Sequence, residues 1–131
     1  MKRIAILLDQ NKHCTTLIFV DSDNAKDILP FLFRDGVDKE FKEIRDILKE
    51  NLRNREKYCK VDVSDKAKDV YEMRFIRNLR NDRIYCKEIR ENQKRMIVMV
   101  ELYIGKKSQD IPKQIKLRIE TIGGYQYEFK F

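Results

Sequence analysis

The sequence predicts a domain built on a curved antiparallel β-sheet, with helices packed beside it. Three strand-like runs follow one another at short spacing between residues 70 and 104, as they do in a meander of neighbouring strands. A strongly amphipathic segment at residues 38–54 precedes these runs and predicts a helix. Basic residues lie on and between the three runs, so the predicted sheet presents cations.

Length and charge bound the class of protein. The 131 residues suit one domain with one core, and no linker rich in Pro, Gly or Ser divides them. Residues 1–65 hold 13 basic and 13 acidic side chains, whereas residues 66–131 hold 16 basic and 9 acidic ones. A basic excess confined to the strand-rich half is typical of a polyanion-binding surface. A soluble domain with a lysine-rich surface is the alternative.

The first half of the chain predicts a hairpin followed by helices. Apolar runs at residues 4–8 and 15–20, separated by a polar loop, indicate two strands. Residues 21–24 are typical helix-capping residues, so a helix is expected from about residue 25. In the helix at 38–54, Glu40 lies near the positive end of the helix dipole. The charged residues between its apolar positions are expected to face solvent.

The second half alternates as strands at residues 70–76 and 83–89. The run at 96–104 is almost wholly apolar, which predicts a central strand covered on both faces. Residues 58–69 predict a loop with room for a short edge strand. A helix is expected over 111–122 and a final strand over 125–131.

Cysteine usage and hydropathy exclude several classes. The three cysteines include no C-x-x-C pair, so neither a disulfide framework nor a zinc site is expected, and a reducing cytoplasm fits best. The N-terminal apolar run is shorter than a signal peptide requires, and no segment reaches membrane-spanning length. No metal and no cofactor are predicted.

Three motifs in the second half resemble the RelE/HigB branch of bacterial toxins, within the RelE/ParE superfamily and including its phage-derived members. They are VYEMRF at 70–75, DRIYCKEI at 82–89 and GKKSQDIPKQIKL at 105–117, which follows the apolar run. The match covers about residues 66–122 of the single domain 1–131. The resemblance implies an α+β fold in which N-terminal helices pack on one face of a curved antiparallel sheet, with one further helix and a C-terminal strand.

The resemblance also implies an activity. Such a toxin is a cytoplasmic, metal-independent endoribonuclease that cuts mRNA, usually at the ribosome, and that a cognate antitoxin protein blocks. Homo-oligomers are possible. Two alternatives stay open: a catalytically degenerate or ParE-like member that acts by binding a protein, and a simple basic nucleic-acid-binding domain.

RNA cleavage by internal attack requires cations that stabilise the negative charge of the phosphorane. Arg83 matches the arginine of the family's second strand and is assigned to the scissile phosphate, where its planar fork can bind two oxygens. Arg74 is expected beside Arg83 across the strand pair. Lys106 and Lys107 would stabilise the phosphorane or transfer a proton.

Three further residues are predicted to contact RNA: Lys87, Tyr85 and Lys113. For Arg83 the structural alternative is an ion pair with Glu72 or Glu101. For Tyr85 it is an ordinary place in the sheet. The only histidine, His13, lies outside the matched region, so the sequence assigns no general base.

Overall fold

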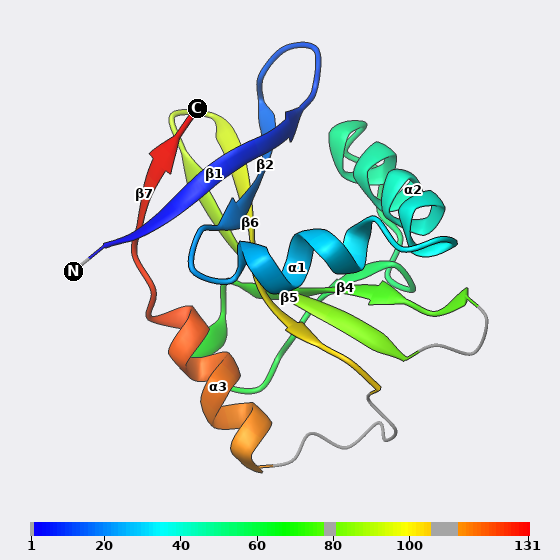
Figure 1. Cartoon of the computed structure of the whole chain (residues 1–131). Helices are drawn as coiled ribbons and strands as arrows, with labels where there is room; N and C mark the ends of the chain where they lie inside the picture. The colour runs from blue at the N-terminus through cyan, green and yellow to red at the C-terminus, as the bar shows by residue number, and fades with distance from the viewer. Residues whose placement is uncertain (1, 78–80, 106–112) are drawn as a thin grey trace.

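The computed structural model describes residues 2–77, 81–105 and 113–131 and is organised around one seven-stranded sheet (Figure 1). The strand order is β3-β4-β5-β6-β2-β1-β7. The strands are β1 (Arg3–Gln10), β2 (Thr16–Asp21), β3 (Tyr58–Lys60), β4 (Val70–Phe75), β5 (Asp82–Glu91), β6 (Lys94–Tyr103) and β7 (Tyr127–Lys130). The helices are α1 (Ala25–Leu32), α2 (Val37–Lys49), the short 3-10 helix η1 (Asp65–Ala67) and α3 (Lys113–Gly123).

The sheet is mixed, so the prediction of a curved antiparallel sheet with N-terminal helices on one face was wrong. Strands β3 to β6 pair antiparallel in chain order, but β2 pairs parallel with β6, and β1 pairs parallel with β7. The central strand β6 is buried from Met96 to Val100 and needs a hydrogen-bonded neighbour on each edge. The N-terminal hairpin supplies the second neighbour, which extends the meander into a mixed sheet.

Helices cover both faces of this sheet. Helices α1 and α2 pack on one face, over a core that includes Ile18, Met73 and Ile97. Helix α3 packs on the other face through Ile119 and Ile122. In the described part of the chain, no helix combines the length and apolar character needed to span a bilayer.

Helix α2 ends five residues before the predicted boundary, at Lys49. Asn51 adopts a left-handed conformation with φ 56°. The N–H of Asn51 donates to the Leu48 carbonyl at 3.1 Å, and the N–H of Leu52 donates to the Ile47 carbonyl at 2.9 Å. This pair of bonds is a Schellman motif, which closes a helix and redirects the chain. Residues 51–55 therefore leave the helix axis, and Leu52 is exposed.

A buried carboxylate joins the strands at the far edge of the sheet. Asp21, at the end of β2, accepts from Arg3 Nε on β1 at 2.7 Å. It also accepts from the Tyr127 hydroxyl on β7 at 2.6 Å. Burial, followed by this bond, raises the pKa of Tyr127, so the phenol remains a donor.

Candidate functional site

The pairing of β4 with β5 places Arg74 directly opposite Arg83, which confirms the expected neighbourhood of these two residues. The same register places Glu72 opposite Tyr85. The intervening Met73 packs into the core beneath α1 and α2, so the four side chains lie on the α3 face of the sheet. We refer to Glu72, Arg74, Arg83 and Tyr85 as the arginine cluster.

Glu72 is the carboxylate shared by both guanidinium groups. Its Oε1 lies 3.3 Å from Arg83 Nη1 and 3.7 Å from Arg74 Nε. The thiol of Cys59, on the edge strand β3, lies 3.7 Å from the same oxygen. Two arginines beside one carboxylate leave the cluster with an excess of one positive charge, which an anion would neutralise.

Several donors of the cluster have unused hydrogen-bonding capacity. Arg83 Nη2 donates to Asn81 Oδ1 at 3.0 Å. Within the described residues, the buried Nε atoms of Arg74 and Arg83 and the hydroxyl of Tyr85 have no hydrogen-bond acceptor. Buried donors without an acceptor cost about 1–3 kcal/mol each. Phosphate oxygens are suitable acceptors for such a set of donors.

The two arginines differ in their access to solvent. The Arg74 side chain is 25% exposed, whereas that of its cross-strand neighbour Arg83 is 1% exposed. Burial, and next the charge of Glu72, raise the pKa of Tyr85 to about 12. Its hydroxyl therefore stays protonated at neutral pH and can only donate a proton, not remove one.

The remaining predicted residues are not gathered at this cluster by the described structure. Lys87 lies further along β5, where its Nζ donates to the carbonyls of Gly123 and Tyr125, the former at 2.8 Å. Burial lowers the pKa of Lys87. Lys113 is exposed at the start of α3. Lys106 and Lys107 lie outside the described residues.

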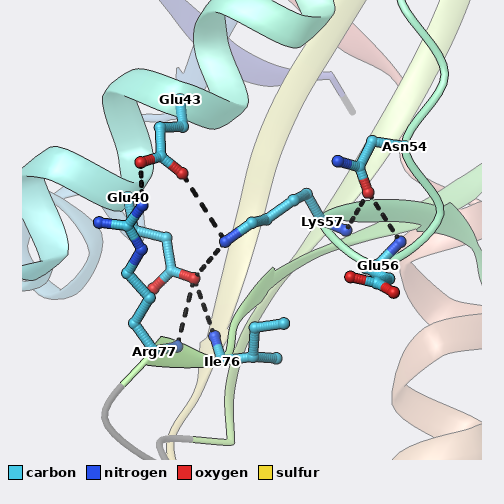
Figure 2. A network of polar contacts seen from close by, with 7 residues as sticks. All are labelled: Glu40, Glu43, Asn54, Glu56, Lys57, Ile76 and Arg77. Carbon is cyan, nitrogen blue, oxygen red and sulfur yellow. Dashed lines mark hydrogen bonds and ion pairs between the residues drawn. The ribbon is translucent and has the colours of Figure 1, made fainter.

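Glu40 is a positioning residue that the sequence pattern assigned to the solvent-facing side of its helix. Its side chain is almost fully buried, and Oε2 accepts from Lys57 Nζ at 2.8 Å (Figure 2). The same oxygen accepts from the backbone N–H groups of Ile76 and Arg77, at 3.0 and 3.3 Å. Glu40 thereby anchors the end of β4, beside Arg74, to α2. Its position one turn before the buried Ile44 was the signal for an inward orientation.

A second carboxylate fixes the other side of the cluster. Asp82, at the start of β5, is buried and accepts from the backbone N–H of Gly105 at 2.8 Å. This bond holds the end of β6 next to Arg83. The position of the arginine pair is therefore set by the backbone on both flanks.

Within the described ranges, no group of three or more His, Cys, Asp or Glu side chains is arranged to hold a metal ion. The cluster offers guanidinium groups, which bind anions, and a phenol and a carboxylate, which can transfer protons. Comparisons of this chain with protein-family models, with curated proteins and with solved structures found no match.

Proposed function

We propose that this chain is the toxin of a toxin–antitoxin pair of the RelE/HigB type. In this proposal it acts in the cytoplasm as a metal-independent endoribonuclease on mRNA, at the ribosome, and a cognate antitoxin protein inhibits it. The observation that carries the proposal is the facing pair of Arg74 and Arg83, which share one carboxylate and keep buried donors without acceptors in the described structure. The basic excess of residues 66–131 supports a polyanionic substrate.

Each group of the cluster has a role in this chemistry. Attack of a ribose 2′-OH on the adjacent phosphate makes a negatively charged phosphorane. Arg74 is the more exposed arginine, so its guanidinium contacts this charge first. The buried Arg83, on the neighbouring strand, adds positive charge and pairs with Glu72. Glu72 is the member of the cluster that can accept the 2′-OH proton. Tyr85 can donate a proton to the leaving 5′-oxygen.

Induced expression of the wild type and of Arg74→Ala tests the proposal, with growth and mRNA 5′ ends as readouts. The wild type is expected to arrest growth and to generate new 5′ ends. Removal of one interaction with the transition state is expected to reduce cleavage about a hundredfold. Arg34→Ala is the matched control, because Arg34 is an exposed arginine that follows α1, the helix on the opposite face of the sheet from the cluster.

A protein-binding, non-cleaving relative is the second candidate, and the near-complete burial of Arg83 favours it. In that case the Arg83–Glu72 pair stabilises the sheet and does not contact substrate. Growth arrest without new 5′ ends would support this candidate and contradict the nuclease. Absence of arrest by the folded wild type would contradict the toxin assignment itself.

A further inference from the structure

We propose that a second surface, on the opposite face of the sheet from the arginine cluster, is a binding groove for single-stranded nucleic acid. The groove has a volume of about 860 Å³ and lies beyond the C-terminal end of α2. The lining residues that matter here, called the basic groove below, are Arg53, Arg55, Lys60, Tyr71, Arg90 and Arg95.

The end of α2 builds one wall of the groove, and four strands build its floor. The Schellman motif at Asn51 turns residues 51–55 out of the helix and brings Arg53 and Arg55 into the wall. The floor residues come from β3, β4, β5 and β6, where Lys60 is paired with Tyr71, and Arg90 with Arg95. Tyr71 shares its sheet face with Met73 of the α2-side core, so the groove is separate from the arginine cluster.

In the part of the chain that the structure describes, three of the five cations of the groove have no carboxylate partner. Within the described residues, the side chains of Arg53, Arg55 and Lys60 make no ion pair or hydrogen bond, and all three residues are exposed. Glu88 is the partner of the other two: it pairs with Arg95 at 2.6 Å and lies 3.8 Å from Arg90. Among the described residues that line the groove, Asp62 is the single acidic one. A concave surface with this balance concentrates polyanions.

An aromatic platform lies on the floor between these cations. The ring of Tyr71 stacks on that of Tyr58, with centroids 5.2 Å apart and planes 5° apart. Tyr58 is buried and donates to Glu88 Oε2 at 3.0 Å, and Arg95 Nε donates to Oε1 of the same carboxylate at 2.6 Å. Tyr71 is only half-buried and lines the groove. One face of its ring is supported by Tyr58, and the other face is available to a ligand.

Cations beside a rigid, accessible tyrosine ring favour one class of ligand. An acidic protein segment would use the cations but would leave the flat ring without a matching partner. A single-stranded nucleic acid uses both, because its phosphates meet the cations and an unpaired base stacks on the tyrosine. A duplex keeps its bases stacked internally, so the ring selects for single strands.

This inference goes beyond the proposed function, because binding in the groove does not depend on cleavage at the arginine cluster. The two surfaces nevertheless meet at the edge strand β3. Cys59 lines the groove, and its thiol lies 3.7 Å from Glu72 of the cluster. A single-stranded nucleic acid bound in the groove could therefore extend across β3 to the arginine cluster.

Fluorescence anisotropy with a labelled oligothymidylate of about 15 nucleotides tests the groove. This DNA probe has no 2′-OH, so binding is measured apart from cleavage. Reversal of two cations, Arg53→Glu with Arg55→Glu, is expected to weaken binding more than tenfold. It should also reduce the slope of log K against log salt by about 0.7 for each phosphate that the variant no longer neutralises. Tyr71→Ala is expected to weaken binding about tenfold, whereas Tyr71→Phe retains it.

The matched control is Lys26→Glu with Lys39→Glu, which makes the same change in net charge on exposed residues of α1 and α2 away from the groove. It is expected to bind as the wild type does. Equal losses in both charge-reversed pairs would overturn the inference, as would unchanged binding by folded Tyr71→Ala. Absence of binding by the wild type, or displacement of the probe by a polyglutamate peptide at equal concentration, would also overturn it. The growth and 5′-end readouts test the arginine cluster separately.

Discussion

Tyr85 places a hydroxyl inside the arginine cluster, where the described residues offer it no acceptor. Tyr85→Phe removes this buried donor, so the variant is expected to gain about 1 kcal/mol in free energy of unfolding at neutral pH. Under the proposed function, the same change is expected to reduce mRNA cleavage. Urea denaturation and 5′-end mapping measure the two effects. A variant that loses stability would show that the hydroxyl is satisfied in the folded protein.

The raised pKa of Tyr85 gives the same variant a distinct pH dependence. The unfolded chain releases this proton near pH 10, whereas the folded protein keeps it to about pH 12. Between these values the unfolded state binds fewer protons, so stability falls as pH rises through the window. Tyr85→Phe lacks this contribution, and its unfolding free energy should decline less than that of the wild type. Tyr103→Phe, on the neighbouring strand, is the control.

At the residue scale, alternation along the strands predicted the arginine pair. The prediction that Arg74 and Arg83 are neighbours depends only on how two consecutive strands pair. The basic groove was not predictable in this way. Arg53 and Arg55 belong to the half of the chain whose net charge is zero. In the described structure neither side chain makes an ion pair, although Glu50 and Glu56 lie within three residues of them in the sequence. Sequence composition contains no information on which charges pair.

At the element scale, α3 is fixed to η1 by a close approach at Gly123. A Cβ at this position would lie 2.1 Å from the Lys66 carbonyl oxygen and 3.0 Å from Ala67 Cα. Gly123→Ala is therefore expected to lower the free energy of unfolding by about 2 kcal/mol. Gly124→Ala meets only Thr121 O at 3.5 Å and should cost much less. Equal costs in urea denaturation would contradict this contact.

Element boundaries were harder to predict than the elements themselves. The apolar stripe of α2 continues to Leu52, which predicted a helix to residue 54, but the left-handed Asn51 ends it at Lys49. Asparagine is the second most favoured residue after glycine at such a position. Asn51 therefore indicated a helix end, but the apolar periodicity that continues to Leu52 indicated a longer helix. A boundary shift of five residues converts the expected end of a helix into the wall of the basic groove.

At the scale of the whole molecule, Tyr127 connects the last strand to the first two through Asp21. Tyr127→Phe removes a hydrogen bond to a charged acceptor, so a loss of about 2 kcal/mol in unfolding free energy is expected. Tyr125→Phe is the matched control, because it keeps the ring that lies 4.2 Å from the Arg3 guanidinium. Thermal and urea denaturation should separate the two variants, and indistinguishable losses would rule out the Asp21 link as the cause.

The whole-molecule arrangement is also where sequence reasoning failed. Pairing among β4, β5 and β6 follows from short turns, since each strand meets the next one along the chain. The parallel pairs β2–β6 and β1–β7 join strands far apart in sequence. Periodicity reports which face of a strand is buried, but it does not report which strand lies beside it. The mixed sheet therefore required the structure.

The parallel pairing of β2 with β6 has a consequence for folding kinetics. Ile18 lies beside Ile97 in the centre of the sheet, so this contact closes a loop that contains most of the chain. Strands β4, β5 and β6 pair with their neighbours along the chain, so this meander can form first. Docking of the N-terminal hairpin on β6 closes a long loop and therefore costs more chain entropy. Until then β1 exposes Ile4, Ile6 and Leu8, which are only partly covered even in the folded state. Slow refolding, with aggregation that increases with protein concentration, is the expected behaviour of this topology.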